Sequence, residues 1–81
     1  MLAMHKIVDI ETTGVVLIKE DTQFNNLQAD KVVVYEGVTA RLYGEIKTVL
    51  ILKKGATVFL HGRIKGKIEN EGGEIVVYPP Q

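Results

Sequence analysis

The side chains with the strongest chemical character in this 81-residue chain are two histidines, His5 and His61. Zinc sites take four ligands from Cys, His and carboxylate residues, and the chain has no cysteine. Serine is also absent, so neither a serine nor a cysteine nucleophile is available. Asp9 and Glu11 are spaced to share one strand face, but nothing in the sequence places them in a pocket. We therefore expect no catalytic residues, no metal and no cofactor, and a protein that is not an enzyme.

A second group of residues is better suited to binding than to catalysis. Arg41 and Tyr43 stand at alternate positions of one segment, and Phe59 and His61 at alternate positions of another. Alternate residues of a strand point to the same side, and aromatic and arginine side chains are enriched at the cores of protein interfaces. These four residues predict an interaction face. The alternative interpretation of His61 is a partly exposed strand histidine without a role.

Basic residues gather in and before the segment "GRIKGK". Such a cluster could contact phosphates or an acidic polymer. Basic and acidic residues number ten each, however, and no spaced aromatic residues accompany the cluster as platforms for stacked bases. Nucleic acid and membrane are therefore not the expected partners, and a solvated face balanced by nearby glutamates is the alternative. The cluster consists of Lys53, Lys54, Arg63, Lys65 and Lys67.

These candidate residues lie in a sequence that repeats itself. The segment Glu36–Thr48 returns eighteen residues later as Lys54–Gly66, with identical residues at six of the thirteen aligned positions. Eighteen residues are too few for a helical-hairpin repeat but enough for one coil of a β-solenoid, whose coils stack about 4.8 Å apart. The identical pairs are Gly37/Gly55, Thr39/Thr57, Leu42/Leu60, Gly44/Gly62, Ile46/Ile64 and Lys47/Lys65.

Apolar residues fall into columns at the same eighteen-residue interval. Alternation along each segment places Val38, Ala40 and Leu42 inside, and the residues between them outside. Gly44 and Gly62 follow, where a coil must bend with positive φ or a close approach of backbones. The predicted columns are Val16–Val34–Leu52, Phe24–Leu42–Leu60–Tyr78, Thr22–Ala40–Val58–Val76 and Ile46–Ile64.

These patterns predict an all-β single domain over residues 1–81: a short, single-stranded parallel β-helix of about three coils. Residues 1–15 would form an N-terminal capping strand or hairpin that turns at "ETTG", residues 16–78 the coils, and residues 79–81 a tail. "NEGGE" predicts another tight turn. The alternative is a small antiparallel β-barrel or sandwich, in which the repeat would reflect duplicated hairpins.

An enzyme remains the least favoured alternative. Apolar residues also recur every six positions, as in the hexapeptide-repeat acyltransferases. The residue after each of them is Tyr, Arg, Lys or Phe, where that family favours small side chains. The six positions are Val34, Ala40, Ile46, Leu52, Val58 and Ile64.

The segment "ADKVVVYEGVTARLYGEIKTVLILKKGATVFLHGRIKG" resembles the bactofilins, bacterial cytoskeletal proteins that form polymers. The likeness covers about Phe24–Tyr78 and lies in the alternation, the period and the glycine positions. It implies a right-handed parallel β-helix and assembly end to end into filaments without a nucleotide. The chain departs from the family in having fewer coils, no flanking tails and an apparent N-terminal hairpin.

A small domain without disulfides commonly gains stability by oligomerisation. The sequence therefore predicts a self-associating structural module with itself as partner. The alternative is a binding module for another protein or an anionic polymer. "MLAMHKIV" meets a charge before any long apolar run, so we expect a cytoplasmic protein without a signal peptide. The predicted assembly edges are Ile75, Val76, Val77 and Tyr78 at one end, and Ile7, Val8 and Ile10 at the other.

Overall fold

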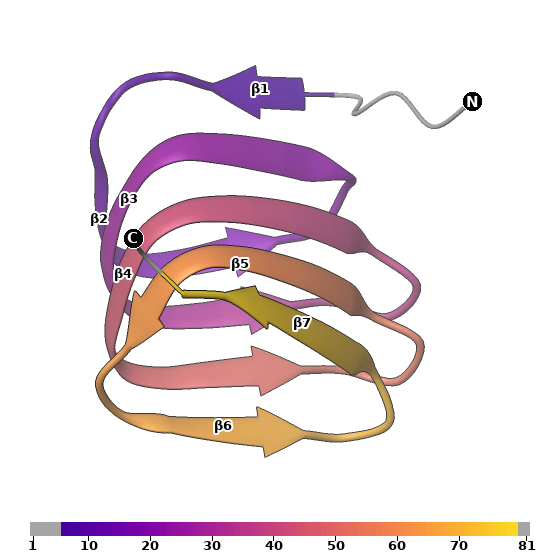
Figure 1. Ribbon diagram of the computed structural model, residues 1–81. Helices are drawn as coiled ribbons and strands as arrows, with labels where there is room; N and C mark the ends of the chain where they lie inside the picture. The colour runs from indigo at the N-terminus through magenta and orange to yellow at the C-terminus, as the bar shows by residue number, and fades with distance from the viewer. Residues whose placement is uncertain (1–5, 80–81) are drawn as a thin grey trace.

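The computed structural model describes residues 6–79, which form a parallel β-solenoid of about four turns (Figure 1). Every strand pairing is parallel, so the solenoid prediction is confirmed and the antiparallel barrel is wrong. No helix long and apolar enough to cross a membrane occurs in this part of the chain. The strands are β1 (Lys6–Val8), β2 (Thr12–Ile18), β3 (Thr22–Val34), β4 (Thr39–Leu52), β5 (Thr57–Ile64), β6 (Lys67–Asn70) and β7 (Glu74–Tyr78).

Two long strands, β3 and β4, form the middle coils, and β1, β2, β5 and β6 each pair with one of them. The N-terminal part of β3 pairs with β1, and its C-terminal part with β2. In the same way β4 pairs with β5 along its first part and with β6 along its last four residues. Strand β7 adds to β5 and begins a further turn (Figure 1).

The expected N-terminal hairpin is wrong. Strands β1 and β2 do not pair with each other; both pair in parallel with β3, and together they form the first coil. The reason lies in β2, where Val16 and Ile18 point inward and add to the core, as the corresponding residues of later coils do. This coil brings the total to about four. His5 and the rest of residues 1–5, with Pro80 and Gln81, lie outside the described residues.

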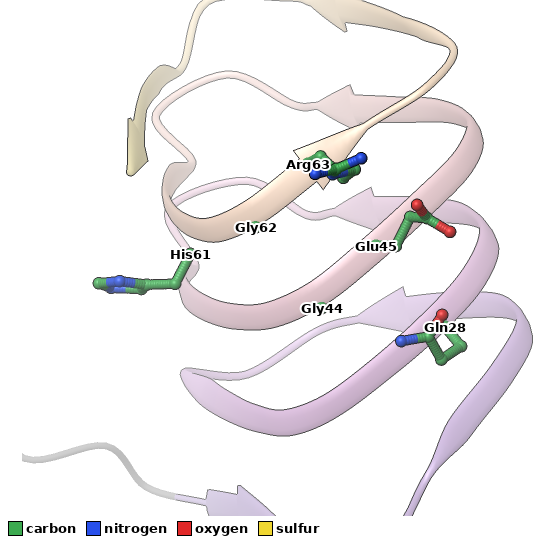
Figure 2. Close-up of a pocket in the computed structure, with 6 residues that line it drawn as sticks. All are labelled: Gln28, Gly44, Glu45, His61, Gly62 and Arg63. Atoms are coloured by element: carbon green, nitrogen blue, oxygen red, sulfur yellow. The ribbon is translucent and has the colours of Figure 1, made fainter. Parts of the chain in front are cut away.

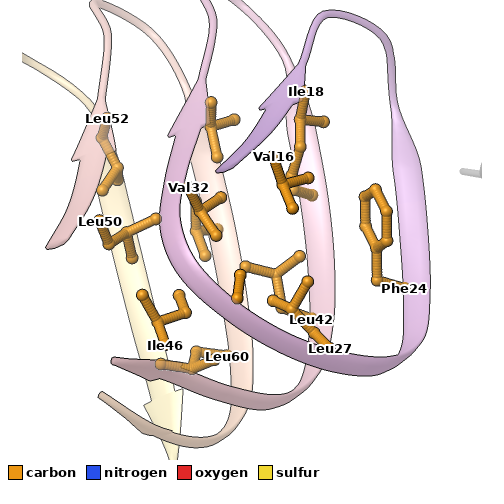
Figure 3. Close-up of a cluster of buried hydrophobic side chains, with 14 of the residues drawn as sticks. Val16, Ile18, Phe24, Leu27, Val32, Leu42, Ile46, Leu50, Leu52 and Leu60 are labelled. Carbon is orange, nitrogen blue, oxygen red and sulfur yellow. The ribbon is translucent and has the colours of Figure 1, made fainter. Parts of the chain in front are cut away.

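The inward side chains form one continuous apolar core (Figure 3). Leu42 and Leu60 lie opposite each other in the register of β4 and β5, and both are completely buried, as the alternation predicts. Thr22 is the buried polar residue of residues 6–79, and its hydroxyl donates to the Glu20 carbonyl over 2.7 Å. The core consists of Val16, Ile18, Phe24, Leu27, Ala29, Val32, Val34, Val38, Ala40, Leu42, Ile46, Leu50, Leu52, Ala56, Val58 and Leu60.

The eighteen-residue interval holds in the middle of the solenoid, apart from a shift to seventeen at residues 27–29, and it fails at the β2–β3 and β5–β7 pairings. Val16 lies opposite Val32 rather than Val34. At the other end Val76 lies opposite Phe59, and Tyr78 opposite His61, so the predicted places of Val76 and Tyr78 in the inward columns are wrong. The bends at residues 19–21 and 71–73 have three residues, against four at 35–38 and 53–56. The one-residue-shorter bend at residues 71–73 turns alternate side chains of β7 to the opposite face. After the bend at residues 19–21 Thr22 stays inward, opposite Ala40.

The short bend before β7 is shaped by Asn70. The Asn70 Oδ1 atom accepts hydrogen bonds from the backbone N–H groups of Gly72 and Gly73 over 3.0 and 2.7 Å, and Asn70 Nδ2 donates to the Gly73 carbonyl. An asparagine side chain that bonds to the backbone just after it stabilises a turn. The tight turn predicted at "NEGGE" is therefore confirmed.

Gly44 and Gly62 lie opposite each other where β4 and β5 bend, with φ of 144° and 152°. A Cβ atom on Gly44 would overlap the carbonyl oxygen of Leu27, and one on Gly62 would overlap the carbonyl oxygen of Gly44. Both reasons that the sequence offered for glycine, the backbone conformation and the close approach, therefore apply here.

We expect Leu60→Ala to lower the free energy of unfolding by about 2–5 kcal/mol, because it leaves a cavity in the packed core. Leu17→Ala is the matched control, because Leu17 points outward from β2 and should cost less than about 1 kcal/mol. Urea unfolding followed by circular dichroism measures both. Equal losses for the two variants would contradict the inward assignment of Leu60.

We expect Gly62→Ala to destabilise the fold by about 2 kcal/mol more than Gly55→Ala. Both glycines have positive φ, but a Cβ on Gly55 would come no closer than 3.6 Å to the backbone of Gly37. The difference between the variants therefore measures the steric cost of close coil packing. Similar unfolding midpoints and slopes in urea for the two variants would show that the coils separate to make room.

Candidate interaction surfaces

The four residues of the predicted interaction face do converge, and a fifth joins them. The rings of Tyr43 and His61 stack at a centroid distance of 4.4 Å and 14° between planes, and those of His61 and Tyr78 at 4.4 Å and 5°. We call these three stacked rings the aromatic ladder. The ladder runs across β4, β5 and β7, because its members lie opposite one another in the register. Tyr78 was expected inside, and the short bend at residues 71–73 brings it to this face.

Arg41 connects the ladder to Phe59. Its Nη1 atom lies 2.8 Å from Nε2 of His61, and its guanidinium lies 4.9 Å from the centre of the Phe59 ring. A guanidinium can only donate hydrogen bonds, so Nε2 of His61 must be the unprotonated acceptor. Burial lowers the pKa of His61 from its ordinary value of 6.5, and the positive charge of Arg41 lowers this pKa further.

These contacts limit what the ladder can bind. Both faces of the His61 ring are covered by tyrosines, and Phe59 is half-buried beneath Arg41. Aromatic pairs of this kind contribute about 0.5–1.5 kcal/mol beyond the area that they bury. The ladder therefore ties β7 to the body of the solenoid, and Tyr78 is its most accessible ring.

A shallow hollow of about 340 Å³ lies beside the ladder, above Gly44 and Gly62 (Figure 2). Glycine has no side chain, so the backbone of β4 and β5 forms the floor. Gln28, Glu45 and Arg63 project on one side, while the His61 ring points away from them. Within residues 6–79 no three His, Asp or Glu side chains come together in a way that could hold a metal ion.

Most residues of the predicted basic cluster are paired with carboxylates in the structure. Three of its lysines form ion pairs: Lys53 with Glu71 at 3.2 Å, Lys65 with Glu45 at 3.7 Å, and Lys67 with Glu69 at 3.1 Å. Arg63 borders the hollow, and Lys54 lies in an exposed bend. Exposed ion pairs stabilise a fold little, but they neutralise the surface. A concentrated basic patch is therefore not what these five residues form.

The two carboxylates weighed as a candidate pair, Asp9 and Glu11, are exposed. Asp9 accepts a hydrogen bond from the side-chain amide of Asn25, which is also exposed. This position therefore fits a solvated edge.

The exposed large hydrophobic side chains of residues 6–79 all lie on the first and last turns of the solenoid. Val8 and Ile75, two of the predicted edge residues, instead pack partly against the core. The outward residues of β2 and the inward residue of β6 were not predicted from the sequence. The exposed residues are Ile7, Ile10, Val15 and Leu17 on the first coil, and Ile68, Val76, Val77 and Tyr78 on the last strands.

A signal for the missed residues was present in the sequence. The run "VVLI" at residues 15–18 is apolar at every position, so both of its faces are apolar. Continuous apolar runs are typical of strands that are covered on both sides. In the structure the inner face of β2 is covered and its outer face is open.

We expect His61→Ala to lower the free energy of unfolding by about 1–2 kcal/mol, because it removes two ring stacks and one hydrogen bond. His61→Phe keeps both stacks and should recover most of this loss. Thermal or urea unfolding at neutral pH measures the difference. If the alanine and phenylalanine variants are equally stable, the ladder does not hold β7 in place.

Comparison of the chain with protein-family models, with curated proteins and with solved structures found no match. Three features of the molecule itself bear on its function: the aromatic ladder, the hollow and the apolar ends. The ladder is engaged internally and the hollow is shallow, whereas the ends expose apolar side chains to solvent.

Proposed function

We propose that the protein is a non-enzymatic structural module that associates with copies of itself through the two ends of the solenoid. The observation that carries the proposal is the position of the exposed large hydrophobic residues. Within residues 6–79 they lie on the first coil and on β6 and β7, and the coils between have none. Apolar surface concentrated in this way commonly marks an interface.

Leu17 occupies a position that is buried in the next coil, which has a neighbouring coil on each side. Leu17 and Val33 both point outward from neighbouring strands, yet Leu17 is 50% exposed and Val33 only 7%. Val33 is flanked by Leu17 on one side and Ile51 on the other, whereas Leu17 has a neighbour on one side only. A further coil against β2 would bury Leu17 as Val33 is buried.

At the C-terminal end, inward-facing residues are likewise exposed where no further coil covers them. Leu60 is completely buried, whereas Val77, which lies opposite it on β7, is 44% exposed. Ile68 of β6 is also exposed, although Leu50 opposite it is buried. Each end therefore offers a surface that another coil fits.

The backbone supports association at the same places. Among the described residues β1, β2, β6 and β7 each pair with a strand on one side only. Their outer edges carry unpaired N–H and C=O groups, which favour pairing with another chain. The resemblance to bactofilins also implies end-to-end assembly. The absence of cysteine fits the proposed cytoplasmic location.

A binding module for an anionic polymer or another protein is the second candidate. The observation in its favour is the hollow, where Gln28, Glu45 and Arg63 present hydrogen-bonding groups above a backbone floor. Such a module would keep its affinity as a monomer. Salt-dependent retention of a monomeric chain on heparin would favour this candidate.

We expect the mean mass of the native protein to rise from low to high micromolar concentration in sedimentation velocity. Val77→Lys and Leu17→Lys should each shift this transition to about tenfold higher concentration, because each places a charge on an apolar end. Glu36→Gln is the matched control, since it changes the net charge equally at an exposed bend in the middle of the chain.

Mixing the two end variants distinguishes the geometry of association. If opposite ends meet, the variants pair through their intact ends and the mixture is heavier than either variant alone. If like ends meet, mixing adds nothing. A native chain that stays monomeric at high micromolar concentration would overturn the proposal, provided that circular dichroism shows it folded.

A further inference from the structure

Strand β7 is lightly attached at the C-terminal end of the solenoid. It pairs with β5 along one edge, and among residues 6–79 no strand pairs with its other edge. Four of its five residues are exposed, and only Ile75 packs partly against the core. Segments with few buried apolar contacts open locally at a small fraction of the global unfolding free energy. The stacking of Tyr78 on His61 therefore contributes much of the attachment of the C-terminal end of β7.

We propose that His61 acts as a pH-sensitive latch, which holds β7 against the solenoid while its ring is neutral and loosens β7 when the ring is protonated. This inference concerns contacts within one chain. It therefore stands or falls separately from the proposed self-association.

The hydrogen bond between Arg41 and His61 provides the sensitivity to protonation. The 2.8 Å contact joins Nη1 of the guanidinium to Nε2 of the imidazole. In a protonated imidazole both nitrogens carry hydrogen and neither can accept. Protonation thus replaces a hydrogen bond with two facing donors that both carry positive charge, and the two groups must move apart.

The surroundings of His61 determine which group moves. Arg41 is held over the ring of Phe59 at 4.9 Å, so the guanidinium has a second contact that keeps it in place. His61 is held by the rings of Tyr43 and Tyr78. A movement of His61 away from Arg41 therefore takes its ring out of the stack on which Tyr78 lies.

Other charged groups near His61 do not offset the new charge. Arg41 and Tyr43 face it from β4, Tyr78 from β7, and Arg63 borders the same hollow from β5. The carboxylate that lines the hollow, Glu45, lies 3.7 Å from the Lys65 ammonium and is thereby already paired. Gln28 of β3, also at the hollow, is neutral. A cation between two tyrosine rings gains some attraction, but this gain does not restore the lost acceptor.

The direction of the pH effect follows from the proton affinity of the ring. Burial and Arg41 hold the pKa of His61 in the closed state below 6.5. Once β7 opens, the ring is more hydrated and its pKa returns toward the ordinary value. The open state thus binds the proton more tightly, and β7 is progressively released as the pH falls below about 6.5.

Amide hydrogen exchange followed by NMR on dilute, monomeric protein tests the latch. Protection factors of Ile75–Tyr78 are compared with those of the core strand β4 at about pH 7.5 and about pH 5. At the lower pH we expect the ratio of the β7 protection factors to the β4 protection factors to fall by about threefold or more. His61→Phe, which keeps an aromatic ring in the stack but cannot titrate, should remove this fall.

Three results would overturn the latch. The ratio stays constant with pH in the native chain, or β7 and β4 lose protection together, or His61→Phe shows the same fall as the native protein. Circular dichroism at both pH values checks that each protein is folded. Arg41→Leu provides an independent second variant: it removes the cation that opposes protonation, and it should weaken the pH response while leaving the tyrosine and histidine rings in place.

Discussion

Parallel pairing between successive coils is the constraint on which the rest of this structure depends. Each of the strands β1 to β5 pairs with a strand one turn later, so most of their residues have a partner at the same place in the next coil. A side chain that points inward in one coil is therefore covered by an inward side chain of the next. The apolar core follows from this arrangement, and the described residues contain no buried side-chain nitrogen or oxygen without a hydrogen bond.

The same constraint organises the outer surface. Because outward residues also align from coil to coil, Tyr43, His61 and Tyr78 stack into a ladder, and Gly44 and Gly62 leave a hollow beside it. Both features arise in the same way, because each consists of residues at equivalent positions of successive coils. A column stabilises the fold where its members attract one another, and it exposes a surface where the stack ends.

At the two ends of the solenoid the strands lack a neighbouring coil on one side. At both of them strand edges and apolar side chains lack the coil that would cover them elsewhere. Solenoids commonly have atypical terminal repeats for this reason. Here the first coil has a shorter interval to its neighbour and β7 begins a turn after a shortened bend, yet neither change covers the apolar side chains. In the function that we propose, self-association would use this surface, and in the proposed latch the contact of His61 with Tyr78 would make the C-terminal end sensitive to pH.

The sequence by itself determined the coiled all-β fold, the inward residues of the middle coils, the two bend glycines and the face formed by Arg41, Tyr43, Phe59 and His61. Alternation within a strand and the repeat between coils are local patterns, and both are complete in residues 36–66. Only the tertiary structure decided that residues 6–18 form a coil, that Glu45 pairs with Lys65, and that Tyr78 completes the ladder. The physical reason is the length of the bends. One residue fewer at residues 71–73 shifts the register of β7 and reverses which of its side chains point inward, and that shift becomes visible only when the coils are stacked.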